Sequence, residues 1–270
     1  MTQSTSTPRR ALITGGANGF GLAAARALLA QGAQVAIGDI NSEQLKAAGQ
    51  SLNSERVLPL ELDVTSPDSV RAAVEACQAT FGGLDTLINS AGVIHFAPMD
   101  EVSEQDWDRV IDIDLKGVFL CCQAAAPLLR QSGRQGRIVN VGSDASKMGW
   151  PLIASYVAAK FGVVGLTKSL AGELAPYEVT VNCVCPGGVS TTGMGQQVLK
   201  WKMELTGKPP EEILAATASD VPLKRNATEA DIVNAIMFFL TDASAFLTGV
   251  VLDVDGGMLS TAPIAGTIKN

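Results

Sequence analysis

The sequence predicts an α/β fold built as one doubly wound domain, with a seven-stranded parallel sheet and helices on both of its faces. Two observations support this prediction. Short runs rich in β-branched residues alternate along the chain with longer, alanine-rich segments of helical periodicity. The short runs are apolar almost throughout, which is typical of strands that are buried on both faces of a parallel sheet.

Seven segments are predicted to be strands, and six longer segments between them are predicted to be helices. The strands are expected at residues 11–14, 34–38, 57–61, 86–89, 136–141, 179–184 and 250–254. The helices are expected at residues 19–31, 42–52, 67–81, 104–129, 155–174 and 229–241. Right-handed crossovers between successive parallel strands would place these helices on alternate faces of the sheet.

The chain of 270 residues contains no Pro/Ser-rich linker that would divide it. We therefore expect one dinucleotide-binding and catalytic domain over residues 9–270, preceded by a flexible polar tail over residues 1–8. Residues 188–226 lack strand periodicity and include the stretch KWKMELTGKPPEEI. Long segments of this kind in a compact domain often bind ligands, so we predict a substrate loop or lid there.

Composition argues against several classes of protein. The formal net charge is −7 and there is no dense run of Lys or Arg, which disfavours a nucleic-acid partner. The beginning, MTQSTSTPRR, has no apolar signal-peptide core, and no stretch reaches the ~18 apolar residues of a membrane span. The 5 cysteines form no CxxC pair, and a single histidine makes a metal site unexpected. These features together predict a cytoplasmic protein without a metal centre.

A glycine-rich turn follows the first predicted strand. In ALITGGANGFGLAAARALLAQG, Gly15, Gly19 and Gly21 lie between that strand and a helix. Glycines let the backbone approach a diphosphate, and the N-terminus of the helix supplies N–H donors. Glycine spacing alone is a weak signal, and a turn that serves only packing is the alternative. Asp39 ends the second predicted strand, where a carboxylate would bind ribose hydroxyls and repel a 2′-phosphate. This context favours NAD over NADP.

A tyrosine and a lysine lie four residues apart in the segment ASYVAAK. On a helix, Tyr156 and Lys160 would point the same way, one turn apart. A nearby ammonium favours the ionised form of a phenol, so the pair could transfer protons near neutral pH. The alternative is a tyrosine at the edge of the core beside a solvated lysine.

These motifs together resemble the short-chain dehydrogenase/reductase family, in its NAD-preferring form with TGxxxGxG and YxxxK motifs. The matching stretches are TGGANGFG, LDV at 62–64, NSAG at 89–92, Ser143, YVAAK, PGGVST at 186–191 and VDGG at 254–257. They occur in order through nearly the whole chain. The resemblance implies a Rossmann-type fold, a nicotinamide coenzyme and hydride transfer at a CH–OH group.

The resemblance also implies roles for individual residues. Tyr156 would be the acid/base, and Lys160 would lower its pKa and hold the nicotinamide ribose. Ser143 would bind the substrate oxygen. Asp114 stands in VIDIDLKGVF where the family usually has Asn, and it is the fourth catalytic position. An aspartate keeps two acceptors but loses the amide donors. We expect this replacement to be tolerated if a backbone carbonyl performs the family's task, whereas a carboxylate facing Lys160 would weaken the effect of the lysine on Tyr156.

The remaining expected contacts also follow from the matched motifs. The coenzyme is expected to touch Gly15, Asn18, Gly19, Phe20, Gly21, Asp39, Ile40, Asp63, Val64, Asn89, Ala91, Gly92, Tyr156, Lys160, Pro186, Gly187, Val189 and Thr191. The substrate is expected to touch Ser143, His95, Asp144, Trp150 and Gly187. His95 could instead only support the pocket wall. Lys200, Lys202 and Lys208 are either contacts for an anionic substrate group or solvated surface residues.

The resulting prediction is an NAD-dependent oxidoreductase of a polyol or sugar-type secondary alcohol. A 3-oxoacyl thioester reductase is the alternative enzyme, and an idle dinucleotide sensor is the alternative of another class. A nucleophilic role for Ser143 is rejected, because GSDAS lacks the glycine that a nucleophile elbow needs two residues after the serine. The resemblance further implies a homotetramer, assembled through the helices expected at 104–129 and 155–174 and through the C-terminal tail.

Overall fold

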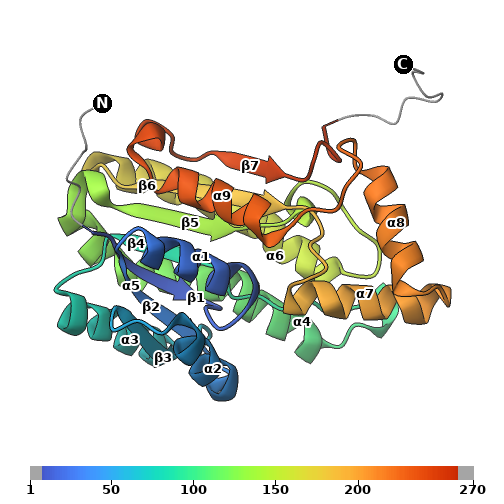
Figure 1. Cartoon of the computed structure of the whole chain (residues 1–270), viewed down its shortest axis with the longest axis horizontal. Coiled ribbons are helices and arrows are strands. Elements are labelled where there is room, and N and C mark those ends of the chain that lie inside the picture. Colours follow the sequence, from blue (N-terminus) through green and yellow to red (C-terminus); the bar gives the residue numbers. More distant parts are fainter. Residues whose placement is uncertain (1–7, 261–270) are drawn as a thin grey trace.

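The computed structural model of the chain describes residues 8–260, so most of the predicted tail (1–7) and residues 261–270 of the predicted domain lie outside the described residues. The described chain contains one sheet of seven parallel strands in the order β3-β2-β1-β4-β5-β6-β7 (Figure 1). The predicted fold class is therefore confirmed. The strands are β1 Arg10–Thr14, β2 Gln34–Asp39, β3 Val57–Glu61, β4 Thr86–Asn89, β5 Arg137–Val141, β6 Thr180–Pro186 and β7 Val251–Val254.

Helices cover both faces of the sheet, as the doubly wound prediction requires (Figure 1). They are α1 Gly19–Ala30, α2 Ser42–Leu52, α3 Pro67–Phe81, α4 Glu104–Ile111, α5 Gly117–Ser132, α6 Ala154–Leu174, α7 Gly193–Thr206, α8 Pro210–Asp220 and α9 Glu229–Phe239. On one face, Ile13 of β1 packs in a core with α1, α2 and α9. On the other face, Leu12 packs in a core with α3, α5 and α6. Successive strand side chains thus serve opposite layers, which explains the continuous apolar strands.

The strand order reverses at β1, which has β2 on one side and β4 on the other. In an open α/β sheet, a crevice forms outside the carboxyl ends of the strands at such a point. Thr14 and Asn89 are paired at the carboxyl ends of β1 and β4, and Asn89 is paired in turn with Asn140 of β5. The fold therefore brings the ends of β1, β4 and β5 to the edge of one crevice.

The helix predicted at 104–129 is interrupted. A π-helical segment, Asp112–Lys116 (η2), separates α4 from α5. Its central residue, Asp114, is turned inward and accepts a hydrogen bond from the backbone N–H of Val93 at 2.8 Å. At the following Gly117, a Cβ atom would lie 2.8 Å from Cγ2 of Val64. A tertiary hydrogen bond and a close packing contact therefore accompany the break, and apolar periodicity reports neither.

Residues 188–226 contain two helices, α7 and α8, that the sequence did not predict (Figure 1). No residue within Gly193–Thr206 is buried, and Ile213 is the buried residue of α8. Because these helices bury so little, they carry no strong apolar stripe, and the periodicity that reveals the other helices is weak here. Among residues 8–260, no helix is long and apolar enough to cross a membrane.

Candidate active site

The glycine turn after β1 fits closely against the chain that follows β4. Gly15 has a φ of +64°, and a Cβ atom there would lie 2.8 Å from Cα of Ala91. At Gly21, a Cβ atom would lie 2.2 Å from the carbonyl oxygen of Gly15. Any side chain at these two positions would push the turn away from Ala91 or from its helix. The glycines thus keep the backbone open for a ligand at the head of α1.

The N-terminus of α1 has no side-chain cap. Asn18 is the N-cap residue, but its side chain donates to Oε1 of Gln44 at 2.9 Å, and the first turn holds no acidic residue. In contrast, α2 and α3 are capped by the side chains of Asn41 and Ser66. The first N–H groups of α1 are therefore available to a diphosphate, and this donor set fits a dinucleotide coenzyme.

Asp39 lies at the end of β2, beside this turn. Its Oδ2 accepts from the backbone N–H of Ala17 at 3.2 Å, and its Oδ1 accepts from that of Asn41 at 3.0 Å. The carboxylate is therefore held in place by two backbone donors. Its neighbour Ile40 is 65% exposed, as suits a residue that could cover an adenine ring. Phe20, which was also expected to touch the coenzyme, packs partly buried against the core shared with α1.

The loops after β3 and β4 supply the next group of expected coenzyme residues. Oδ1 of Asp63 accepts from the backbone N–H and the hydroxyl of Thr65, at 2.9 and 2.7 Å. Val64 is buried, and Asn89 donates through Nδ2 to Oδ1 of Asn140 at 2.8 Å. At Gly92, a Cβ atom would lie 2.9 Å from Oδ2 of Asp114. Asn89 is thus bonded to β5, and the absence of a side chain at Gly92 leaves room for the carboxylate of Asp114.

Ser143, Tyr156 and Lys160 come together at the carboxyl ends of β5 and β6. Tyr156 and Lys160 lie one turn apart on α6 and are 7% and 4% exposed. The ammonium Nζ lies 5.4 Å from the centre of the tyrosine ring and donates to the carbonyl oxygen of Val141 at 3.2 Å. Ser143 is buried just beyond the end of β5. The predicted pairing on one helix face is present, and both members are buried, not solvated.

Asp114 faces Lys160 directly. Its Oδ2 lies 3.2 Å from Nζ of Lys160, and its Oδ1 takes the hydrogen bond from Val93. Of the two geometries considered from the sequence, the structure shows the one in which the carboxylate contacts the lysine. A buried pair of this kind is governed by its mutual attraction and by the cost of removing both charges from water.

Lys160 lowers the pKa of Tyr156, as predicted, but burial and Asp114 act in the opposite direction. Burial raises the pKa of the Tyr156 phenol above its ordinary value, Lys160 opposes this, and Asp114 reinforces it. Burial lowers the pKa of Lys160, but Asp114 and Tyr156 together with Cys183 act against it, and the net pKa is raised. Burial also raises the pKa of Asp114 against the lowering effect of Lys160. In the chain by itself the net direction for the pKa of the phenol is therefore upward, although Lys160 acts on it in the predicted downward direction.

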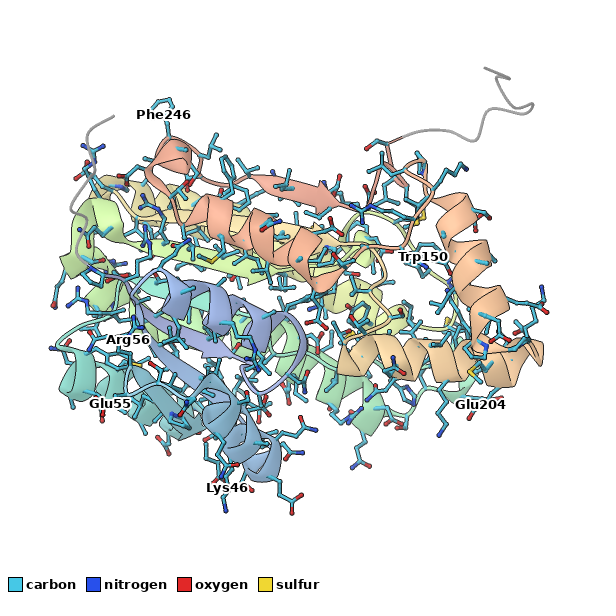
Figure 2. All side chains as sticks on the ribbon, viewed as in Figure 1. Lys46, Glu55, Arg56, Trp150, Glu204 and Phe246 are labelled. Atoms are coloured by element: carbon cyan, nitrogen blue, oxygen red, sulfur yellow. The ribbon has the colours of Figure 1, made fainter. Side chains whose placement is uncertain are left out.

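Among the expected substrate residues, Asp144 is hydrogen-bonded to the serine, whereas His95 and Trp150 have other surroundings. Ser143 donates through Oγ to Oδ1 of Asp144 at 2.7 Å. His95 has Nε2 at 3.8 Å from Oδ2 of Asp106, and its buried Nδ1 has no hydrogen-bond partner among the described residues. Trp150 is 38% exposed at the end of the molecule that holds α7 and α8 (Figure 2).

The segment after β6 begins with the expected coenzyme residues Pro186, Gly187, Val189 and Thr191. Pro186 and Val189 are buried, and Gly187 lines a cavity of about 140 Å³ together with Val254 and Asp255. Thr191 donates through Oγ1 to Oε1 of Glu229 at 3.0 Å. Its hydroxyl is therefore directed to α9, and it would have to turn to reach a nicotinamide amide.

Two features of the site were missed from the sequence. Phe96, after β4, stacks on Trp201 of α7 with ring centres 4.4 Å apart and planes inclined by 12°. Thr192 caps α7, and its side chain would lie 3.4 Å from a Cβ atom at Gly19. Aromatic residues make up only 5% of the chain, and Phe96 and Trp201 lie far apart in it, so no local pattern predicts their stack. The stack joins α7 to the loop after β4, and Thr192 at the start of α7 lies next to the glycine turn.

The fold and the site together define a dinucleotide-binding oxidoreductase. The features that define it are the uncapped first helix of an α/β sheet, the carboxylate at the end of β2 and the buried Ser–Tyr–Lys group. The chain belongs to the short-chain dehydrogenase family, whose model, described as short chain dehydrogenase, matches residues 9–203. The predicted family is thus confirmed. Members of this family act on hydroxyl and keto groups with nicotinamide coenzymes.

Individual relatives agree over almost the whole chain. It is 38% identical to 2-(S)-hydroxypropyl-CoM dehydrogenase 3 of Xanthobacter autotrophicus, over 91% of this chain and 94% of the relative. It is 36% identical to a 3-oxoacyl-[acyl-carrier-protein] reductase of Staphylococcus aureus, over 93% of this chain and 98% of the relative. The solved sorbitol-6-phosphate 2-dehydrogenase of Erwinia amylovora superposes with a TM-score of 0.87 at 34% identity, over 93% of this chain and all of that chain.

Proposed function

We propose that this protein is an NAD(H)-dependent oxidoreductase that interconverts a secondary alcohol and a ketone, with a polyol or sugar-type compound as substrate. The observation that carries the proposal is a buried group in which both Ser143 and Lys160 act on the phenol of Tyr156. A proton acceptor, a cation and a hydroxyl donor at one place are what alcohol oxidation requires from the protein.

The protein's part in the reaction is to handle the proton and to orient the substrate. When bound, the nicotinamide coenzyme takes up or returns the hydride. The oxygen of Tyr156 accepts the substrate hydroxyl proton during oxidation and gives it back during reduction. Lys160 stays protonated because Asp114 and its other neighbours raise its pKa against burial, so its charge favours the phenolate. The positive charge of the oxidised coenzyme would further lower the pKa of Tyr156, which burial raises. Ser143 holds the substrate oxygen.

The preference for NAD rests on Asp39. Its carboxylate is fixed by two backbone N–H groups at the end of β2. It would accept hydrogen bonds from both ribose hydroxyls, while a 2′-phosphate would meet its negative charge. The stretch GDINSEQ provides no basic residue to offset that repulsion.

Two alternatives each have an observation in their favour. The 36% identity to a 3-oxoacyl reductase favours a thioester substrate. The carboxylate of Asp114 against Lys160 favours an idle site that only senses the dinucleotide, because it raises the pKa of Tyr156. The buried Ser–Tyr–Lys group favours the enzyme over the sensor, and Asp39 favours the alcohol dehydrogenase over an NADP-linked reductase.

The test is a substrate panel assayed with Tyr156→Phe. Polyols, sugars, hydroxy acids and 3-oxoacyl thioesters are compared with NAD(H) and NADP(H) in parallel. The variant should bind the coenzyme normally in calorimetry and lose about 10²- to 10⁴-fold in turnover. The chain's other tyrosine, Tyr177, is 44% exposed, so Tyr177→Phe is a matched control that should keep full activity. A Tyr156→Phe variant with parental turnover would refute the proposed role, and preference for the thioesters would select the alternative enzyme.

We also propose a homotetramer in a reducing, cytoplasmic environment. Phe119 of α5 and Phe161 of α6 are 42% and 46% exposed, and Gly165 and Gly172 of α6 have open space where a Cβ atom would be. An open face of this kind suits close helix pairing between subunits. All five cysteines are free and buried, which favours a reducing compartment. Light scattering after size exclusion would give about four times the chain mass, and a monomer would contradict the assembly.

A further inference from the structure

Asp144 places a carboxylate directly beside the reactive serine. Its Oδ1 accepts hydrogen bonds from the Ser143 hydroxyl at 2.7 Å and from the backbone N–H of Ala145 at 2.7 Å. The short segment Asp144–Ser146 (η4) is fixed by a capping box in which Ser143 and Ser146 bond each other's backbone N–H groups. The carboxylate is therefore held in one position next to the place where the substrate oxygen would bind.

The second oxygen of this carboxylate is unused. Oδ2 of Asp144 accepts no hydrogen bond from residues 8–260. It is also not one of their fully buried side-chain atoms that lack a partner, so it is accessible to solvent. The charged and titratable groups around it come from several elements. They are Lys202 of α7, Asp255 after β7, and Tyr156 of α6, which senses the charge of Asp144. Asp255 is occupied with the backbone N–H groups of Gly257 and Leu259. Oδ2 is therefore without a donor among residues 8–260, while Lys202 and Asp255 act on the charge of this carboxylate.

We propose that Asp144 is a specificity-determining residue that binds a second hydroxyl of the substrate, on the carbon next to the reacting one. The inference rests on the proposed function and names its substrate class: vicinal diols in the oxidative direction and α-hydroxy ketones in the reductive direction. An ionised carboxylate has only acceptor sites, so it selects a neighbouring group that can donate. Two hydroxyl oxygens on adjacent carbons are about one hydrogen-bond length apart, similar to the 2.7 Å between Ser143 Oγ and Asp144 Oδ1.

The single hydroxyl proton of Ser143 gives this arrangement a second consequence. In the structure that proton is donated to Asp144, so it is not directed at a substrate oxygen. A substrate hydroxyl that donates to Oδ2 leaves the carboxylate with two donors, this hydroxyl and the N–H of Ala145, without the serine. Ser143 can then turn and donate to the reacting oxygen. A diol therefore completes the site, whereas a mono-alcohol leaves Ser143 and Asp144 bonded to each other.

Substrates with an acceptor or an anion next to the reacting carbon are disfavoured for the same physical reason. A keto or carboxylate oxygen at that place would face Oδ2 without a hydrogen between them. Rejection of such compounds does not require a clash, because an unpaired buried acceptor is itself costly.

The experiment compares matched substrate pairs in the parent and in Asp144→Asn. The pairs are 2,3-butanediol with 2-butanol and trans-1,2-cyclohexanediol with cyclohexanol, each oxidised with NAD. The parent should prefer each diol by about 10- to 100-fold in kcat/KM, the worth of one hydrogen bond to a charged group. The variant amide should keep the Ser143 contact and offer N–H donors where Oδ2 was, so the preference should fall to about threefold or less. In the reductive direction with NADH, it should favour 2,3-butanedione over 3-hydroxy-2-butanone more than the parent does.

The control variant is Glu204→Gln, which removes a negative charge from the exposed surface of α7 (Figure 2). It should leave the diol preference unchanged. Each preference is a ratio of two kcat/KM values measured within one preparation, so partial misfolding does not affect it. Asp144→Ser provides the same readout if Asp144→Asn does not fold. A parent that oxidises mono-alcohols as well as diols, or an unchanged preference in the Asp144 variants, would overturn this inference and leave the proposed function standing. A parent that oxidises none of the four alcohols but does oxidise a polyol or sugar of the substrate panel would overturn this inference alone, and one that oxidises none of these compounds would overturn both.

Discussion

The carboxylate of Asp114 and the ammonium of Lys160 form a buried ion pair, with 3.2 Å between Oδ2 and Nζ. The pair exists because a π-helical segment turns Asp114 inward to the backbone N–H of Val93. In this pair Asp114 contributes to the raised pKa of Lys160, and at the same time it raises the pKa of Tyr156, which Lys160 lowers. The charge balance of the whole group therefore depends on one carboxylate.

Asp114→Asn should move the pH dependence of alcohol oxidation to lower pH. Asp114 raises the pKa of Tyr156, so its removal lowers that pKa, and the phenolate forms at lower pH. The acidic limb of the profile of kcat against pH should shift accordingly. Asp112→Asn is the control, since Asp112 is an exposed partner of Lys116 in the same segment. An acidic limb that stays in place would show that the carboxylate does not act on the phenol. We expect turnover at the optimum to rise by less than about 100-fold, because a larger gain would mean that the natural residue impairs the enzyme.

Lys160→Met should destabilise the protein strongly. The change leaves the carboxylate of Asp114 buried without its cation, a loss of typically about 3–5 kcal/mol in the free energy of unfolding. The double variant Asp114→Leu/Lys160→Met removes both charges and should recover much of this loss. Urea denaturation of the parent, both single variants and the double variant gives the coupling energy. Additive effects would contradict a direct interaction.

Asp39→Ser should relax the choice of coenzyme. Without the carboxylate, a 2′-phosphate no longer meets a negative charge beside the glycine turn, while the ribose of NAD loses an acceptor. The ratio of kcat/KM for NADP to that for NAD should rise by about tenfold or more. Glu43→Gln, in the first turn of α2, is a control that should leave this ratio nearly unchanged. Preference of the parent enzyme for NADP would overturn the role of Asp39.

Trp201→Ala should loosen α7. The stack between Phe96 and Trp201 joins α7 to the loop after β4, and a pair of this kind contributes about 0.5–1.5 kcal/mol beyond its buried area. Hydrogen exchange should quicken in residues 193–206, and the KM for the alcohol should rise more than kcat falls. Trp107→Ala, on the partly exposed face of α4, is the matched control. Equal exchange in α7 of both variants would mean that the stack does not hold the helix.

The thiols should be unreactive in the native protein. All five cysteines are free and buried, and burial raises the pKa of Cys77 and of Cys122 to about 12. Thiolates are the reactive species, so a disulfide reagent should label less than about one thiol per native chain and all of them after denaturation. Cys183 lowers the pKa of the Cys185 thiol, so Cys185 is protected by its burial alone. Rapid labelling of the native protein would show that these two cysteines of β6 are accessible.

The sequence by itself determined the alternation of strands and helices, the glycine turn and the pairing of Tyr156 with Lys160 on one helix face. Each of these features is local. Side chains of a strand return to the same face every two residues, and those of a helix every three to four. A tight turn needs glycine at the position where the backbone turns. Residues close along the chain are sufficient to specify them, and the structure reproduces them.

The tertiary structure decided the remainder: the break at Asp114, the helices α7 and α8, the raised pKa of Tyr156 and the bond from Ser143 to Asp144. The break follows from a hydrogen bond between α4–α5 and the loop after β4, and the pKa follows from burial by several elements together. Desolvation and Coulomb interactions depend on distances through space, and those distances exist only once the chain has folded.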